Sequence, residues 1–436
     1  MSHAVFSLYI NLKLFMHRSL LPALLVACHV ALAQPVAQKF TPAGTAAETG
    51  FRAERLQRLD TLLQGWVDTG IAPNAVTFVA HNGKIVHYKA FGYSNLDKKI
   101  PLKRDAIFRI ASQSKALVTT ALMTLFEEGR FMLDEPIAKY IPAFKNPRVL
   151  VSFDKAAGTY ETRPAKSEIT IRQLLSHNAG IPYEHPLDQL PQFRIPFFNS
   201  TDPDKLEDVI NKLAKRPLIK DPGDGFTYGL NTDIVGRLVE ILSGESLDAA
   251  LRKRVLEPLG MNDTYFYLPE AKAGRLVELY TKGSTGAPLT VHENNTYRTY
   301  PVTGAKTYFS GGAGLVSTIE DYAKFCQMML NQGTFNGKRI LGRKTVEQML
   351  RNQIGEASVW DRQDKYGLGF QLITENSHYG DQATPGSFTW GGMYCSEFTI
   401  DPKENLIMLI FTNVHPYAYY GDFVRKFRST VYQALE

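Results

Sequence analysis

The stretch Ile110-Ala111-Ser112-Gln113-Ser114-Lys115 stands at the start of a predicted helix, and the rest of the chain is organised around it. Gly129, directly after Glu128, predicts where this helix ends. Ser112 and Lys115 are then one turn apart on the same helix face. Apolar residues recur at spacings of three and four and predict one buried stripe, formed by Leu117, Val118, Ala121, Leu122, Leu125 and Phe126.

Two interpretations of Ser112 and Lys115 are open on this stretch alone. Serine is a favoured helix N-cap, and a lysine in the first turn is common. Alternatively, a nearby amine that accepts the serine proton converts a weak nucleophile into a strong one. The remaining sequence has to decide between a structural and a catalytic pair.

Length and composition limit the function classes. The 436 residues can bury a large core, and 44% hydrophobic and 21% charged residues are typical of a globular protein. The net charge of +6 is modest, and no basic run is interleaved with aromatic residues, so nucleic acid is not an expected partner. No histidine, cysteine or carboxylate cluster has metal-site spacing, and the G-x-x-x-x-G-K motif is absent. We expect neither a metal nor a cofactor.

The N-terminus predicts an export signal over residues 1–33. A short apolar run, 20–27, follows His17-Arg18, and Ala31-Leu32-Ala33 forms an A-x-A cleavage site before Gln34. The run is too short to span a membrane. We therefore expect a periplasmic or secreted protein, with residues 34–46 as a linker.

Two alternatives concern this N-terminal segment. Leu25-Val26-Ala27-Cys28 resembles a bacterial lipoprotein box, which would place a lipid anchor on Cys28. Met16 is an alternative start, since residues 16–33 alone make a complete signal. The mass of the mature N-terminus distinguishes A-x-A cleavage from lipidation.

The outer thirds of the chain predict a shared antiparallel sheet flanked by helices. A helix is predicted over 47–69, and Asn82-Gly83 predicts a hairpin turn between strands 75–80 and 85–88. The C-terminal part predicts a final helix, 421–435, after the strands 366–373, 387–390, 396–400 and 406–412. An α/β domain is thus expected over 47–145 and 340–436.

The middle third, 146–339, predicts an inserted, mostly helical domain. Residues 181–203 are rich in proline and aromatic residues without a period and predict a loop. Helices are predicted over 169–177, 204–214, 231–243, 246–255 and 318–331, with Thr170 and Thr318 as caps. A cleft between two such domains is a usual place for an active site. Cys326, in a helical pattern, and Cys395, in a strand pattern, are expected as buried thiols without a bridge.

Two further stretches join the Ser112 segment. Pro222-Gly223-Asp224-Gly225-Phe226-Thr227-Tyr228-Gly229-Leu230-Asn231 leads into a helix, and Gly386-Ser387-Phe388-Thr389-Trp390-Gly391-Gly392-Met393 lies on a strand. Together, the three resemble the serine β-lactamase/penicillin-binding-protein superfamily. Within it the chain is most similar to class C β-lactamases and family VIII carboxylesterases. Flanking segments such as Gly311-Gly312-Ala313-Gly314 extend the likeness over nearly the whole mature chain.

The resemblance implies an α+β fold of the β-lactamase/transpeptidase type and a set of site residues. Ser112 is similar to the acylated nucleophile, Lys115 to the residue that helps take its proton, and Tyr228 to the tyrosine beside the serine. The backbone N–H groups of Ser112 and Met393 are expected to form the oxyanion hole. Trp390, Gly391 and Gly392 occupy the place of the K-T-G strand and are expected to bind substrate.

Two departures from the family pattern bear on the substrate. Class C enzymes carry Tyr-x-Asn, whereas Leu230 takes the third position here and Asn231 follows it. The asparagine contact is therefore either lost or supplied by Asn231. Trp390 stands where lactamases have the lysine that binds a β-lactam carboxylate. The W-G-G sequence is similar to that of family VIII esterases.

These observations favour an exported serine hydrolase that cleaves carboxylic esters of short acyl chains through an acyl-Ser112 intermediate. The same fold with another small-molecule substrate is the alternative: a β-lactamase, or a hydrolase of D-amino-acid or cell-wall peptides that cleaves amides. A non-catalytic relative that binds a ligand is the third interpretation, because fold alone does not determine function. The G-x-S-x-G elbow of α/β-hydrolases is absent.

Overall fold

A nine-stranded sheet is the largest element of the computed structural model, which describes residues 39–43, 45, 47–360, 362–377 and 382–436. The signal peptide, the Cys28 box and the alternative start at Met16 lie outside these residues. The strand order is β1-β3-β2-β17-β16-β15-β14-β13, with β4 beside β3. The bounds are β1 Thr41–Pro42, β2 Asn74–His81, β3 Lys84–Asn95, β4 Ile100–Pro101, β13 Lys365–Tyr366, β14 Gln371–Leu372, β15 Phe388–Gly392, β16 Ser396–Asp401 and β17 Leu406–Phe411.

The two ends of the chain meet in this sheet, as the sequence predicted. β2 pairs antiparallel with β17, so that Val79 lies opposite Met408 and Phe78 opposite Leu409. β2 and β3 form the predicted hairpin, and Asn82 (φ 52°) and Gly83 (φ 73°) both take the left-handed conformation that the turn requires. All six residues of β17 are buried, because helices cover both faces of the sheet.

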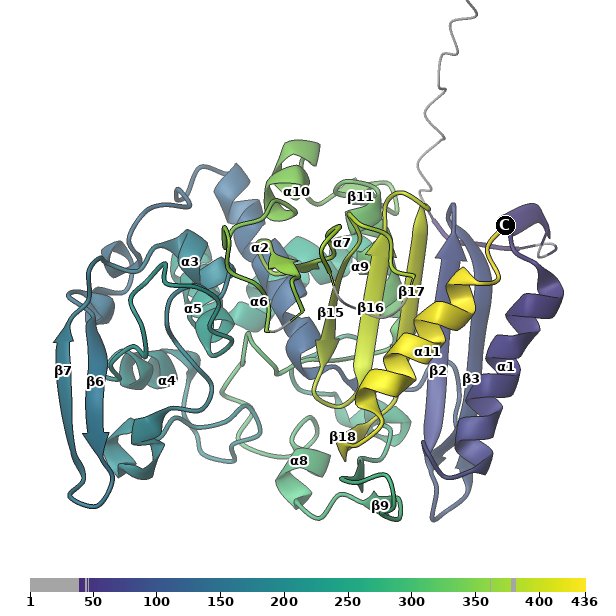
Figure 1. The fold of residues 1–436 in the computed structure, drawn as a ribbon, viewed down its shortest axis with the longest axis horizontal. Helices are drawn as coiled ribbons and strands as arrows, with labels where there is room; N and C mark the ends of the chain where they lie inside the picture. The colour runs from purple at the N-terminus through teal and green to yellow at the C-terminus, as the bar shows by residue number, and fades with distance from the viewer. Residues whose placement is uncertain (1–38, 44, 46, 361, 378–381) are drawn as a thin grey trace, which may run out of the picture. The chain divides into compact units, whose positions relative to one another are not determined.

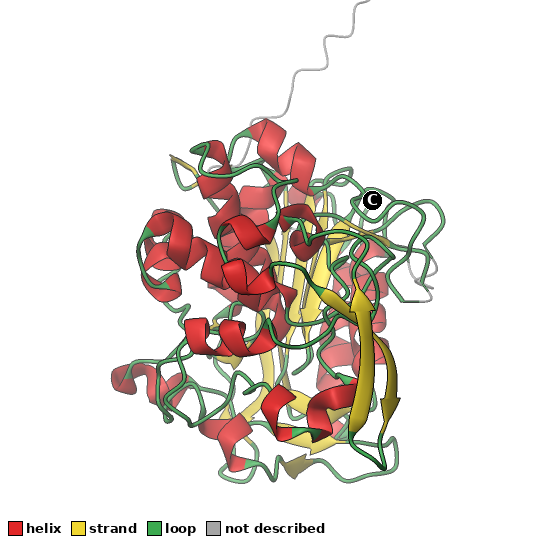
Figure 2. Ribbon diagram, turned by 90° about the vertical axis from the view of Figure 1, so that its left-hand side faces the viewer, coloured by secondary structure: helices red, strands yellow, loops and turns green. Residues whose placement is uncertain are grey.

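Helices pack on both faces of the sheet (Figures 1 and 2). On one face lie α1 (Ala53–Asp68) and α11 (Tyr420–Tyr432), which contact each other, with Trp66 stacked on Phe423. On the other face α9 (Ile319–Leu330) packs against β17 and β2. The remaining helices are α2 Ser114–Glu127, α3 Ile171–Leu175, α4 Leu206–Leu213, α5 Asn231–Ser243, α6 Leu247–Leu251, α7 Glu257–Leu259, α8 Asn295–Thr299 and α10 Arg343–Met349.

The middle region contains the predicted helices but also strands that the sequence did not predict. β6 (Arg148–Asp154) and β7 (Thr159–Pro164) form a hairpin whose residues are mostly exposed. Because few of its side chains are buried, it lacks the clear apolar alternation that marks a half-buried strand. Short pairs complete the fold: β5 Phe108–Arg109 with β10 Val316–Ser317, β8 Tyr280–Lys282 with β9 Thr290–Val291 and β18 Val414–Tyr417, and β11 Thr334–Phe335 with β12 Lys338–Arg339.

Three sequence predictions need correction. α2 is buried on nearly all sides rather than along one stripe, because α5, α6 and the helical turn 252–256 pack against it. The strand predicted over 366–373 is a tight hairpin of β13 and β14, in which Gly369 (φ +83°) turns the chain. Cys395 lies in the turn between β15 and β16, with a φ of +65°, and not in a strand.

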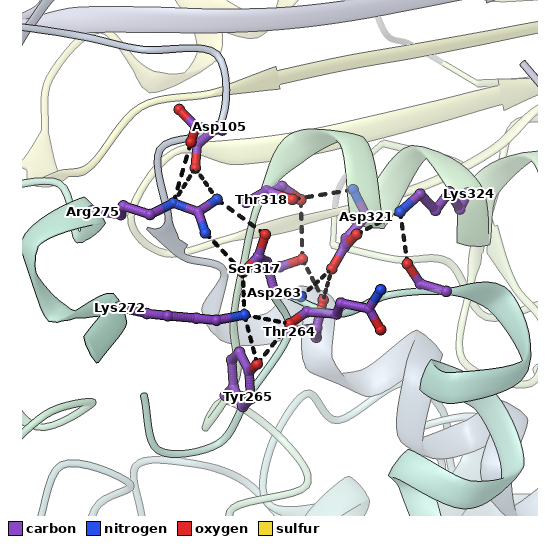
Figure 3. A network of polar contacts seen from close by, with 12 residues as sticks. Asp105, Asp263, Thr264, Tyr265, Lys272, Arg275, Ser317, Thr318, Asp321 and Lys324 are labelled. Atoms are coloured by element: carbon purple, nitrogen blue, oxygen red, sulfur yellow. Dashed lines mark hydrogen bonds and ion pairs between the residues drawn. The ribbon is translucent and has the colours of Figure 1, made fainter. Parts of the chain in front are cut away.

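A polar network holds the strands that flank the Ser112 segment (Figure 3). The Asp321 carboxylate accepts hydrogen bonds from the Asp263 backbone N–H (2.7 Å) and the Thr264 hydroxyl (3.2 Å). The Thr264 hydroxyl also bonds the Ser317 hydroxyl at 2.8 Å. Ser317 belongs to β10, which pairs with β5, the strand that leads into Ser112. This network therefore fixes the backbone on one side of the Ser112 segment.

The described residues all lie in one compact unit. The division into an α/β domain and an inserted domain stays a prediction. Cys326 and Cys395 are buried and free, as expected, and burial raises the pKa of both thiols well above the usual value. Among the described residues, no helix combines the length and the apolar character needed to cross a bilayer.

Candidate active site

Ser112 lies in a 3₁₀ turn, Ala111–Gln113, directly before α2. Its side chain is partly exposed, whereas the residues on both sides of it are fully buried. The preceding residue, Ala111, has a φ of +41°, which a non-glycine residue adopts at an energetic cost. The fold thus holds this turn in a strained conformation that leaves the Ser112 hydroxyl accessible.

Lys115 is fully buried, and its ammonium group donates three hydrogen bonds. The acceptors are the Ser112 hydroxyl (3.2 Å), the Tyr183 hydroxyl (2.8 Å) and the Gly312 carbonyl (2.8 Å). The ammonium also lies 4.7 Å from the centre of the Tyr228 ring. These contacts compensate for the burial of the charge, and they exclude the interpretation of Lys115 as a surface lysine.

Tyr228 approaches Ser112 from the loop before α5. Its hydroxyl donates a hydrogen bond of 2.6 Å to the Ser112 Oγ atom. The loop is fixed by a bond of 2.6 Å from the Thr227 N–H to the His177 carbonyl. Gly229 has no room for a side chain, because a Cβ atom there would meet the Ile181 carbonyl. Ser112, Lys115 and Tyr228 therefore form one hydrogen-bonded group, as the resemblance implied.

Tyr183 is a member of this group that sequence reasoning missed. It belongs to the loop 181–203, its ring lies 5.3 Å from that of Tyr228, and burial raises its pKa well above the usual value. Loop residues carry no periodic signal, so only the local richness in aromatic residues pointed to this segment. Tyr183 supplies a polar contact to Lys115 that the sequence did not predict.

The structure does not bring Asn231 to the cavities beside Ser112. Asn231 is fully buried at the start of α5, and its amide nitrogen bonds the His177 imidazole (2.9 Å) and the Ile181 carbonyl (3.1 Å). It therefore holds the loop that carries Tyr183 rather than facing substrate. Leu230, its neighbour, lines the larger cavity and places an apolar group there.

Trp390 lies at the centre of β15, beside the catalytic group. Its ring is 5.3 Å from that of Tyr228 and stacks on Trp360 at 5.7 Å with an interplanar angle of 15°. Only 3% of Trp390 is exposed, so it belongs to the core and to the cavity wall at once. Trp360 is 48% exposed and extends this wall outward, a residue to which sequence reasoning gave no role.

Gly391 and Gly392 are required by the packing of the protein itself. A Cβ atom on Gly392 would meet the carbonyl of Ile110, two residues before Ser112, and one on Gly391 would meet the Tyr420 hydroxyl. Gly392 lets β15 approach the Ser112 segment closely, and Gly391 makes room for Tyr420. The space at both glycines is thus taken by the protein itself, and their binding of substrate stays a prediction.

Two cavities meet at Ser112. The larger, about 450 Å³, is mostly apolar, and its wall includes Phe197, Phe198 and Leu230. The smaller, about 230 Å³, runs along Trp390 and Trp360 toward Arg362 and Glu397. Ser112, Tyr228 and Met393 line both. A substrate with two parts on either side of a carbonyl can therefore place that carbonyl at Ser112. The oxyanion role of the Ser112 and Met393 N–H groups stays a prediction.

Electrostatics favour a neutral imidazole beneath the site. His177 is buried, and burial together with the charge of Lys115 lowers its pKa well below the usual value. Its hydrogen bond with Asn231 gives it a structural role. Within the part of the chain that the structure describes, no group of histidine, cysteine and carboxylate side chains could hold a metal ion.

Comparisons with known proteins match this geometry. A family model described as Beta-lactamase matches residues 59–425. An uncharacterised Mycobacterium tuberculosis protein is 31% identical over 364 residues, covering 78% of this chain and 86% of that protein. Esterase EstB of Burkholderia gladioli is 26% identical over 389 residues, covering 86% and 94%. The solved structure of EstCE1, a hydrolase with promiscuous acyltransferase activity, gives a TM-score of 0.75 at 25% identity and covers 87% and 99%.

Proposed function

The chain belongs to the beta-lactamase family of serine hydrolases, and we propose that it is an exported esterase that cleaves carboxylic esters of short acyl chains through an acyl-Ser112 intermediate. The family match spans most of the chain, and esterase EstB is among the relatives. The hydrogen-bonded group of Ser112, Lys115 and Tyr228 supports the acyl-serine step. The identity of the ester stays open to the assays below.

The proposed reaction has two steps. In the first, Tyr228 reacts as a phenolate beside the positive charge of Lys115: the Ser112 oxygen attacks the ester carbonyl while its proton passes to the Tyr228 oxygen, 2.6 Å away. The bond to the alcohol breaks, and Tyr228 returns the proton to the leaving oxygen. In the second, water attacks the acyl-Ser112 carbonyl by the same proton route and releases the acid. The Ser112 and Met393 N–H groups hold the carbonyl oxygen.

The proposal that the substrates are esters rests on Trp390. At this position a lysine would bind a substrate carboxylate, and an indole ring cannot. The surroundings are also aromatic, since Trp360, Tyr228 and Tyr366 all contact the Trp390 ring. The cavity therefore favours a neutral group beside the scissile bond. Hydrolysis of p-nitrophenyl butyrate tests this proposal.

The assay compares the wild type with the variant Ser112→Ala. We expect the wild type to release p-nitrophenol and the variant to lose at least about a thousandfold in kcat, as when other serine hydrolases lose their nucleophile. Thr159→Ala, an exposed change on β7 far from the site in the fold, is the matched control and should keep full activity. Activity that persists in Ser112→Ala refutes the assignment.

A second function is supported by the far end of the smaller cavity. Arg362 and Glu397 line it together with Trp390, and the Arg362 guanidinium lies 5.5 Å from the Trp360 ring centre. Arg362 could bind a carboxylate further from Ser112 than a lysine at 390 would. β-Lactams or D-amino-acid peptides would then be substrates. Turnover of nitrocefin faster than that of p-nitrophenyl butyrate would make this the better proposal.

Export is proposed from the N-terminal segment. The apolar run and the A-x-A site predict release of a mature protein that begins at Gln34, in the periplasm or medium. Mass spectrometry of the mature N-terminus tests this directly. A diacylglyceryl cysteine at position 28 would show instead that the protein is held at a membrane by lipid.

A further inference from the structure

A buried carboxylate lies behind Lys115 and does not touch either cavity beside Ser112. Asp233 is 1% exposed and belongs to the first turn of α5, five residues after Tyr228. Its Oδ1 atom accepts hydrogen bonds from the Tyr308 hydroxyl (2.9 Å) and the Ser310 hydroxyl (2.7 Å). The backbone of Gly312 lies against the other oxygen, Oδ2. Asp233 thus holds the segment 308–312 through two hydroxyl donors and this close contact.

The same segment holds the catalytic ammonium group. The carbonyl of Gly312 accepts one of the three Lys115 hydrogen bonds, at 2.8 Å. Gly312 therefore lies between the two groups: its backbone packs against the Asp233 carboxylate, and its carbonyl accepts a hydrogen bond from Lys115.

The close contact between this segment and the start of α5 explains its glycines. A Cβ atom on Gly312 would lie 2.5 Å from the Asp233 Oδ2 atom, and one on Gly311 would lie 2.5 Å from the Thr232 carbonyl. Real side chains never approach so closely, so only glycines allow the segment to lie against the start of α5. The Gly311-Gly312-Ala313-Gly314 motif serves this packing.

Charge gives the arrangement its chemical consequence. Burial raises the pKa of Asp233, while the Ser310 bond, the charge of Lys115 and the Tyr308 bond act against that rise. The titratable groups that face this pair are Tyr183, Tyr228 and His177 around Lys115, and Tyr308 beside Asp233. Tyr183 and Tyr308 have pKa values raised by burial, and His177 has a lowered one, so these three are neutral near neutral pH. Asp233 is the negative group that compensates Lys115.

We propose that Asp233 is a positioning residue for catalysis: it anchors the segment 308–312, which holds the Gly312 carbonyl against Lys115, and places a carboxylate behind the ammonium group. Asp233 acts through Lys115 and does not touch substrate. The proposal rests on the proposed role of Lys115 in activating Ser112, but not on which ester or amide is cleaved.

The test measures the rate at which a fluorophosphonate labels Ser112, as a function of pH, by intact mass. The labelling rate measures the nucleophilicity of Ser112 and does not depend on the natural substrate. A failure of the esterase proposal would appear instead in the p-nitrophenyl butyrate assay. For Asp233→Asn we expect a loss of roughly tenfold or more, because a positioned proton-transfer group contributes on the order of 10²–10⁴ in rate.

The pH profile separates positioning from general damage. The Asp233 carboxyl titrates in the wild type and the amide of Asp233→Asn does not, so the acidic limb of the labelling profile should be absent in the variant. Asp401→Asn is the matched control: it removes another buried carboxylate, which accepts the Tyr432 hydroxyl at the end of β16 away from Gly392, and should leave the profile in place. An Asp233→Asn variant with the wild-type rate and profile would overturn the proposal.

Ser310→Ala carries the test if Asp233→Asn does not fold. The Ser310 hydrogen bond lowers the pKa of Asp233, so its removal raises that pKa. Asp233 then becomes neutral at a higher pH, and the acidic limb of the labelling profile moves upward, whereas Asp233→Asn removes that limb. A folded Ser310→Ala variant whose acidic limb stays in place would contradict the role of the charge.

Discussion

The hydroxyl of Tyr183 decides how the Lys115 ammonium is held. Tyr183→Phe removes the 2.8 Å acceptor and keeps the ring that packs on Tyr228. One buried N–H then loses its partner, which costs about 1–3 kcal/mol. We expect kcat for p-nitrophenyl butyrate to fall about tenfold or more with little change in KM. Tyr160→Phe, an exposed tyrosine on β7, is the control, and equal losses in both variants would contradict the role of Tyr183.

Leu230 is the residue that makes the larger cavity apolar at the family's asparagine position. Leu230→Asn restores the Tyr-x-Asn pattern and places an amide in that wall. We expect kcat/KM to fall about tenfold for a hexanoyl ester relative to an acetyl ester, because an apolar pocket discriminates by about 1–3 kcal/mol per methylene. Ile241→Asn, an exposed change on α5, should leave this ratio of kcat/KM values unchanged. An unchanged preference in Leu230→Asn would place the acyl chain elsewhere.

At this scale the sequence predicted Ser112, Lys115, Tyr228 and Trp390, because each lies in a motif whose spacing is characteristic. It did not predict Tyr183 or Asp233. Tyr183 lies in a loop without a period, and Asp233 lies on a helix where an acidic residue in the first turn is expected anyway. Their importance follows from contacts with Lys115 and Gly312, which are distant in the chain.

The element that leads into the Tyr183 loop is α3, and its stability depends on a capping box. The Thr170 hydroxyl accepts the Gln173 N–H (3.2 Å), and the Gln173 side chain accepts the Thr170 N–H (2.9 Å). Thr170→Ala should lower the free energy of unfolding by about 1 kcal/mol. Urea denaturation, with Thr159→Ala as an exposed control, measures this. A midpoint equal to that of the wild type would show that the cap does not contribute.

Elements were predictable where burial imposes a pattern. The β2–β3 hairpin and α9 with its Thr318 cap were predicted because their apolar periods and turn residues agree. The exposed β6–β7 hairpin was missed because it has no buried face, and the β13–β14 turn was missed because the apolar run continues through it. The pairing of β2 with β17 could be proposed only from the layout of the chain, since register is a tertiary property.

The response of the whole molecule to acid follows from its carboxylates. Hydrogen bonds from Lys139 and Tyr140 lower the pKa of Glu135 from 4.5 to about 2. A carboxylate with a lowered folded-state pKa contributes stability that is present above its unfolded value and is lost as pH falls through the folded value. Others with a lowered pKa are Asp60, Asp134, Asp263 and Glu278.

We therefore expect Tm to fall steadily as pH is lowered from about 4.5 toward about 2. Asp233 and Asp321, whose pKa values are raised by burial, act in the opposite direction and reduce the slope. Circular dichroism melts across this range measure the effect, with Glu135→Gln expected to show a shallower fall. A constant Tm would mean that the carboxylates with raised pKa values balance those with lowered pKa values.

The central claim for the whole protein is that Ser112 becomes acylated. The most direct measurement is the intact mass of the enzyme quenched in acid within seconds of mixing with p-nitrophenyl butyrate, followed by mapping of the modified peptide. We predict a mass increase of one butyryl group on the peptide that contains Ser112, and no increase in Ser112→Ala. A butyryl group on another residue, or the same increase in Ser112→Ala, would contradict the claim.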